Sequence, residues 1–63
     1  MTLSEYFDAA KCCYEPLLNY MFDKWNDGKR VTTVLKCQNC GLFHVLNFDE
    51  NEEIKENYTT EEV

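Results

Sequence analysis

The chain lacks the long apolar runs, glycine-rich loops and side-chain sets on which membrane proteins and most enzymes depend. No segment approaches the ~18 consecutive apolar residues of a membrane span, and the first five residues do not show the basic-then-apolar order of a secretory signal. His44 is the only histidine, and neither a Ser-His-Asp order nor a glycine-rich phosphate loop is present. We therefore expect no membrane association and no enzymatic activity.

Basic residues are also scarce, with six Lys and Arg against twelve Asp and Glu, for a net charge of −6. Residues 1–48 carry equal numbers of acids and bases, whereas residues 49–63 carry one base, Lys55, among the acids Asp49, Glu50, Glu52, Glu53, Glu56, Glu61 and Glu62. Binding to phosphates requires clustered Lys and Arg, so direct nucleic-acid binding is not expected. This shift predicts one domain over residues 1–48 and an acidic, partly disordered tail over 49–63, with a short helix around 50–57 as the alternative.

Four cysteines are present in only 63 residues. A chain this short buries only ~60% of its unfolded surface, so its core is marginal unless a cross-link supports it. In the absence of a secretory signal the expected compartment is the reducing cytoplasm, where paired cysteines bind metal more often than they form disulfides. The cysteines are therefore the candidate cross-link.

The first part of the chain has a helical pattern. Thr2 followed by Glu5 is a capping-box signature. Apolar residues then recur at intervals of three and four, which is typical of one helix face: Leu3, Tyr6, Phe7, Ala10, Tyr14, Leu17, Leu18, Met21 and Trp25. Because proline breaks a helix interior, Pro16 predicts two helices, about 3–14 and 16–26, or one kinked helix.

The next part predicts a β-hairpin. Residues 30–36 are rich in β-branched side chains, and residues 42–48 are mostly apolar. Between them stands the turn Cys37-Gln38-Asn39-Cys40-Gly41. The predicted fold class is α+β: an N-terminal helix, kinked or split at Pro16, packed on a hairpin with a Cys-x-x-Cys turn.

This turn resembles one half of a zinc ribbon, the zinc knuckle, over about residues 33–46. Two residues between the cysteines let both thiolates face one point ~2.3 Å away, and the following glycine permits the backbone conformation that closes the turn. The resemblance implies that Cys37 and Cys40 bind Zn²⁺. The second Cys-x-x-Cys turn of a complete ribbon is missing from this chain.

Cys12 and Cys13 are the first choice for the other two zinc ligands, and His44 is the alternative fourth ligand. Adjacent cysteines project ~100° apart on a helix, so both reach one ion only where the helix frays. Pro16 favours fraying near residue 13. A site shared by two chains, in a homodimer, is a further possibility, and the cysteines could also simply be buried in the core.

Nine aromatic residues are more than so small a core can bury, which indicates a binding surface. We expect a small, acidic, zinc-stabilised protein-interaction module that binds a larger protein and regulates or inhibits it, in the style of phage and bacterial regulators. For a phage-encoded chain the compartment would be the host cytoplasm. The predicted contacts are Tyr20, Phe22 and Trp25, with Glu52 and Glu53 facing a basic surface.

Two other functions fit the same sequence. A DNA mimic would present its carboxylates to a DNA-binding protein. A redox or metal-handling protein would instead use Cys37 and Cys40 as a reactive pair, although such pairs usually stand at a helix N-terminus rather than in a hairpin turn.

Overall fold

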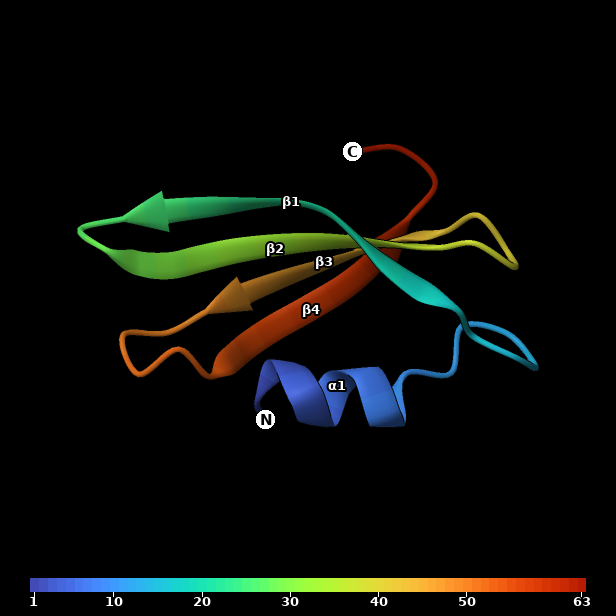
Figure 1. The fold of residues 1–63 in the computed structure, drawn as a ribbon, viewed down its shortest axis with the longest axis horizontal. Helices are drawn as coiled ribbons and strands as arrows, with labels where there is room; N and C mark the ends of the chain where they lie inside the picture. Colours follow the sequence, from blue (N-terminus) through green and yellow to red (C-terminus); the bar gives the residue numbers. More distant parts are fainter.

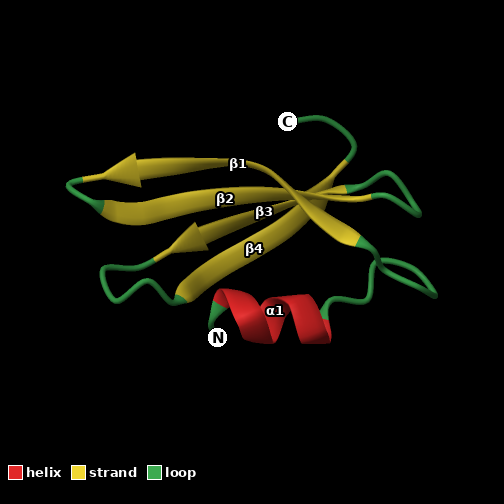
Figure 2. Ribbon diagram, viewed as in Figure 1, coloured by secondary structure: helices red, strands yellow, loops and turns green.

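The computed structural model describes all 63 residues, which form one helix and a four-stranded antiparallel sheet (Figures 1 and 2). The elements are α1 (Leu3–Ala9), β1 (Leu18–Asn26), β2 (Lys29–Cys37), β3 (Phe43–Phe48) and β4 (Ile54–Thr60). The strands lie side by side in the order in which the chain makes them. The α+β prediction is confirmed. No helix is long and apolar enough to cross a membrane.

The predicted capping box begins α1. The Glu5 N–H donates to the Thr2 hydroxyl at 3.3 Å, and the Thr2 N–H donates to the Glu5 carboxylate at 2.8 Å. These bonds satisfy two of the amides that a helix start leaves free. Ala10 is already extended, with ψ of 133°, so the helix ends well before residue 14, where the sequence pattern placed its end.

The prediction of a second helix over 16–26 is wrong, because this segment is β1. Asp27 and Gly28 have φ of 52° and 77°, the left-handed values that a two-residue hairpin turn requires. Asn26 pairs with Lys29, and the strands continue to Leu18 opposite Cys37. The Asp-Gly dipeptide is therefore a hairpin turn, and the aromatic residues before it favour a strand.

The last fifteen residues contain a strand where the sequence predicted disorder or a short helix. Ile54 pairs with Phe48, and Tyr58 pairs with Val45. The preceding turn is organised by Asp49, whose carboxylate accepts the N–H groups of Asn51 and Glu53 at 2.8 and 3.1 Å. These bonds lower the pKa of Asp49. An edge strand of this kind draws its order from the backbone ladder and needs few buried side chains.

The hydrophobic core lies between α1 and one face of the sheet. Tyr6 packs there against Leu35, Leu46 and Phe48, which are at most 5% exposed. Around this cluster lie the partly buried Leu3, Phe7, Ala10, Leu18 and Ile54. This core fixes the end of α1 against the sheet, and so fixes the loop that follows.

Candidate metal centre

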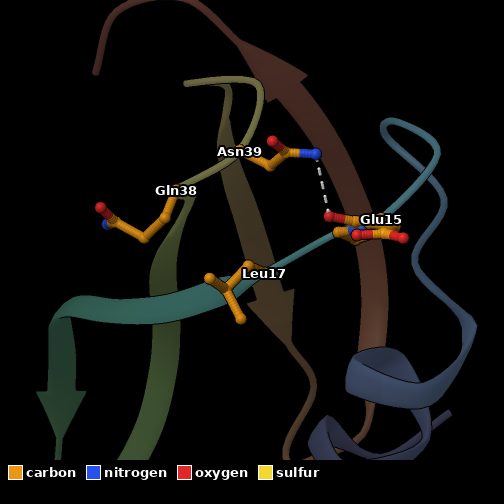
Figure 3. Close-up of a pocket in the computed structure, with 5 residues that line it drawn as sticks. Glu15, Leu17, Gln38 and Asn39 are labelled. Atoms are coloured by element: carbon orange, nitrogen blue, oxygen red, sulfur yellow. Dashed lines mark hydrogen bonds between the residues drawn. The ribbon is translucent and has the colours of Figure 1, made fainter.

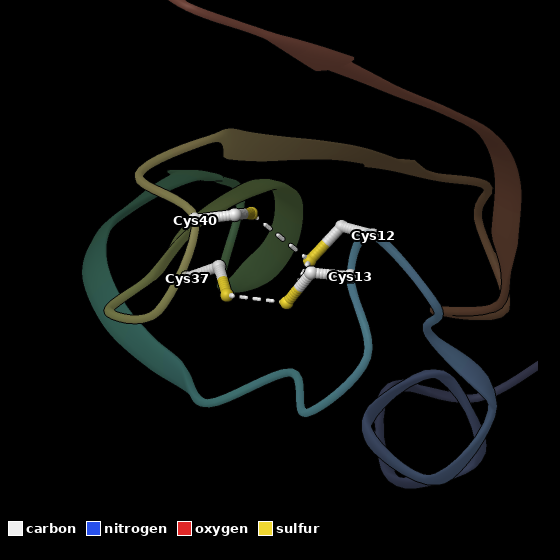
Figure 4. A group of neighbouring side chains, drawn as sticks. All are labelled: Cys12, Cys13, Cys37 and Cys40. Atoms are coloured by element: carbon white, nitrogen blue, oxygen red, sulfur yellow. Dashed lines mark hydrogen bonds between the residues drawn. The ribbon is translucent and has the colours of Figure 1, made fainter.

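The four cysteines meet at one end of the sheet (Figure 4). Cys12 and Cys13 lie in the loop between α1 and β1, Cys37 is the last residue of β2, and Cys40 lies in the turn before β3. Their four Sγ atoms all lie within 4.8 Å of one another. No other group of three or more Cys, His, Asp or Glu residues offers such an arrangement.

The sulfur spacing suits a tetrahedral metal ion. Four sulfurs at ~2.3 Å from a zinc ion stand about 3.8 Å from one another. The Sγ–Sγ distances are 3.4 Å for Cys12–Cys40, 3.8 Å for Cys13–Cys37 and 3.9 Å for Cys12–Cys13. No disulfide is present. The thiols therefore surround a position that a metal ion can occupy with little rearrangement.

The early end of α1 explains how two adjacent cysteines reach one point. Because the chain is extended at Ala10 and bends through residues 12–15, Cys12 and Cys13 are free of the ~100° helical separation. From the sequence we expected both cysteines to reach one metal ion only if the helix frays near residue 13. The structure meets this condition by ending the helix at Ala9.

Backbone hydrogen bonds shape the turn that holds Cys37 and Cys40. The Cys37 N–H donates to the Leu42 carbonyl at 2.9 Å, and the Gly41 N–H donates to the Cys37 carbonyl at 2.8 Å. Gly41 has φ of 81°, which other residues adopt only at a cost. The Gln38 N–H donates to the Leu17 carbonyl at 2.8 Å, which joins the turn to the loop that carries the other two cysteines.

Two N–H groups outside the four cysteines donate to the sulfurs. The Leu17 N–H lies 3.5 Å from the Cys37 Sγ, and the Asn39 Nδ2 lies 3.6 Å from the Cys13 Sγ. The same Nδ2 also donates to the Glu15 carbonyl at 3.2 Å (Figure 3). Sequence reasoning assigned no role to Asn39 or Leu17, although N–H donors to sulfur are common in such turns.

The hydrogen bonds and the burial act in opposite directions on the thiol pKa values. Backbone N–H groups, that of Leu17 first, lower the pKa of Cys37 to about 6. Burial raises the pKa of Cys12 and of Cys13, because a thiolate there is taken out of water beside other sulfurs. A divalent cation among them favours the thiolate form of every ligand.

His44, the alternative fourth ligand, lies in the core and not among the sulfurs. It is 1% exposed and shares a hydrogen bond of 2.6 Å with the Tyr6 hydroxyl through Nδ1. Its Nε2 is buried without a partner, and burial lowers its pKa. The pair joins α1 to β3.

The residues predicted to bind a partner lie in three places. Tyr20 packs against Phe7 of α1, with ring centroids 5.7 Å apart. Phe22 pairs with Val34 on the face of the sheet away from α1. Trp25 stands near the β1–β2 turn, with the Arg30 guanidinium 5.1 Å from its ring centroid. The three do not form a single surface.

Glu52 lies at the same end of the sheet as Trp25, where Lys29 and Arg30 join the β1–β2 turn to the β3–β4 turn. The Arg30 N–H donates to the Glu52 carboxylate at 3.2 Å, and the Lys29 ammonium donates to the Glu50 carbonyl at 3.1 Å. Glu53 follows in the same turn and is exposed. This end is opposite the cysteines (Figure 1).

The chain was compared with known proteins, and no relative was found. No family model matches the chain, and no similar protein was found among curated sequences or solved structures.

Proposed function

We propose that this chain is a zinc-stabilised protein-interaction domain in which Cys12, Cys13, Cys37 and Cys40 hold one structural Zn²⁺. The observation that carries the proposal is the convergence of four sulfurs within 4.8 Å. Four thiolates occupy all four coordination positions of a tetrahedral zinc ion and leave none for water, so the ion has no catalytic role. It joins the loop before β1 to the turn after β2.

The proposed binding surface is the end of the sheet opposite the zinc, and its partner is a larger protein with a basic, apolar surface. Trp25 is 56% exposed, and exposed aromatic side chains are common anchors in interfaces. Glu50, Glu52 and Glu53 lie in the β3–β4 turn at the same end of the sheet, where Lys29 and Arg30 contact Glu50 and Glu52, and their carboxylates suit a basic rim on the partner. A phage or bacterial regulator or inhibitor is the type of protein that we infer.

The zinc site is tested by replacing one ligand at a time with serine and loading the purified chain with Co²⁺, a spectroscopic substitute for Zn²⁺. The intact protein should give the absorption of a tetrahedral tetrathiolate site, and each single variant should lose it. Retention of that spectrum by either Cys12→Ser or Cys13→Ser would remove the cysteine concerned from the ligand set.

The binding surface is tested separately by affinity capture with Trp25→Ala, with Tyr14→Ala as the matched control. Tyr14 is 96% exposed and lies in the loop beside the cysteines. The Trp25 variant should lose a partner that the intact chain and the control retain, while all three bind zinc equally. Equal capture by all three proteins would contradict this surface.

A DNA mimic is the second candidate, and the ordered β4 favours it. Mimics spread carboxylates over a folded face, and Glu56 lies on a paired strand. Deleting residues 50–63 would remove a strand, so the discriminating variant is the triple change of Glu50, Glu52 and Glu53 to Gln. Mimicry requires this variant to lose binding, whereas a Trp25-centred interface requires only a partial loss.

A redox or metal-handling function has less support. Cys37 is completely buried, and a reactive thiol has to be reached by its target. Fast alkylation of Cys37 in the metal-loaded protein would favour this function over a closed structural site.

A further inference from the structure

The face of the sheet away from α1 carries a cross-strand row of apolar side chains. The register places Phe22 of β1, Val34 of β2, Val45 of β3 and Tyr58 of β4 next to one another. Val34 and Val45 lie outside the core cluster that packs on α1. Phe22 and Tyr58, at the two ends of the row, are 46% and 53% exposed. Val34 and Val45, between them, are only 2% and 6% exposed, so the accessible apolar surface of the row belongs mainly to Phe22 and Tyr58.

A polar row lies beside the apolar one, one pleat closer to the β1–β2 turn. It consists of Lys24, Thr32, Asn47 and Glu56, again one residue from each strand. The Thr32 hydroxyl donates to Asn47 at 2.9 Å, and the Asn47 amide donates to Glu56 at 2.7 Å. A positive charge therefore stands at one edge of the sheet and a negative charge at the other.

On the opposite side of the apolar row, Lys36 and Phe43 face each other across β2 and β3. The Lys36 ammonium lies 5.4 Å from the Phe43 ring centroid. The two rows that flank the apolar row thus carry unlike groups on the two halves of the sheet, Lys24 and Glu56 in one row and Lys36 and Phe43 in the other.

We propose that a second copy of this chain covers this face, related to the first by a twofold axis that runs parallel to the strands. Such an axis places β1 of one copy over β4 of the other, and β2 over β3. Lys24 then faces Glu56 of the second copy, Phe22 faces its Tyr58, Val34 faces its Val45, and Lys36 faces its Phe43. Every contact is complementary, and each occurs twice.

The size of the face sets the strength of this dimer. Four strands about 4.8 Å apart and three rows about 7 Å apart give a contact of roughly 20 by 20 Å on each copy. The two copies together bury about 800 Å², less than the ~1,200 Å² at which stable specific interfaces begin, so we expect a weak dimer with a dissociation constant of about 10–100 µM. The dimer requires neither the zinc ligands nor Trp25, so its failure would leave the proposed function standing.

The test is sedimentation velocity on the zinc-loaded full chain, over concentrations that bracket about 10–100 µM at ~0.15 M salt, where the net charge of each copy is screened over about 8 Å. Lys24→Glu and Glu56→Lys should each weaken the dimer at least tenfold, because each places like charges face to face. The double variant should restore it. Within one chain the two residues lie at opposite edges of the sheet, about 14 Å apart, so restoration reports contact between copies.

Lys11→Glu, which makes the same change of charge in the exposed loop after α1, is the matched control and should leave the dimer unchanged. Circular dichroism of every variant verifies the fold. A wild-type chain that stays monomeric over the whole range would overturn the proposal and leave the face to another partner. So would Lys24 and Glu56 variants that behave like the Lys11 control, or a double variant that is no better than the single ones.

Discussion

Individual cysteines in the candidate metal centre differ in exposure, from the completely buried Cys37 to the exposed Cys40. Cys37 also receives the Leu17 N–H, while Cys13 receives the side-chain amide of Asn39. In a zinc tetrathiolate site with a charge of −2, such N–H donors spread the negative charge and orient the ligands. We therefore expect Leu17 and Asn39, which are not ligands of the proposed site, to contribute to its metal affinity.

Replacing Asn39 with alanine should lower zinc affinity about 10- to 100-fold, the usual cost of losing a partner of a metal ligand. The change removes the N–H donor to Cys13 and the link to the Glu15 carbonyl together. Competition with a chromophoric chelator measures the affinity. Gln38→Ala, one residue earlier in the same turn, is the control and should bind zinc as the intact chain does. An Asn39 variant with unchanged affinity would contradict this role.

His44 should make the stability of the fold depend on pH. Burial lowers its pKa below the ordinary value of 6.5, so the unfolded chain takes up a proton first as the pH falls. The free energy of unfolding should be unaffected by His44 above pH 6.5, and should decrease from there down to the lowered pKa.

Urea unfolding between neutral and mildly acidic pH measures this dependence, with His44→Gln as the comparison. Zinc content is measured at each pH, because acid also protonates the thiols. The variant should be less stable at neutral pH and should lose less stability on acidification. Parallel curves for the two proteins would show that His44 does not titrate in this way.

At the scale of elements, the β1–β2 hairpin depends on two residues with positive φ, Asp27 and Gly28. Gly28→Ala should destabilise the protein by about 1 kcal/mol, because a side chain is disfavoured at that φ. An added Cβ meets no atom within 4 Å, so steric overlap adds nothing to the cost. Chemical denaturation measures the change, and Asp27→Asn, which tolerates positive φ, is the control. Equal stability of Gly28→Ala and the intact chain would contradict the turn geometry.

The helix and the first strand differ in how well local sequence signals predicted them. Thr2 and Glu5 predicted the start of α1 because a capping box is a local interaction. The apolar spacing over 16–26 predicted a helix wrongly, since bulges near Tyr20 and Lys24 shift the alternation of β1 away from a strict period of two. The Asp-Gly dipeptide contained the correct signal.

Long-range pairing explains the other differences. β4 has too few apolar residues to predict a strand by itself, and its order comes from the β3 backbone. The Cys-x-x-Cys turn was recognisable because its geometry is local. The approach of Cys12 and Cys13 to that turn depends on where α1 ends and on the Gln38–Leu17 bond, neither of which is a sequence pattern.

For the whole molecule, the core is small and the proposed zinc site is correspondingly important. Only nine of 63 residues are buried, and the cluster under α1 has four members. Structural zinc contributes an apparent ~10–16 kcal/mol in zinc-finger peptides, which is comparable to the ~5–15 kcal/mol of total stability of a typical domain. We therefore expect the metal-free chain to be largely unfolded.

Native mass spectrometry of the purified chain, before and after treatment with a strong chelator, tests the zinc site most directly, with circular dichroism of the same samples. We expect one Zn²⁺ per chain before treatment, and loss of the sheet signal when the ion is removed. Two results would contradict the proposed zinc site. One is a chain that holds no metal either as purified or after reconstitution with Zn²⁺, and the other is a chain that keeps its full sheet signal after the ion is removed.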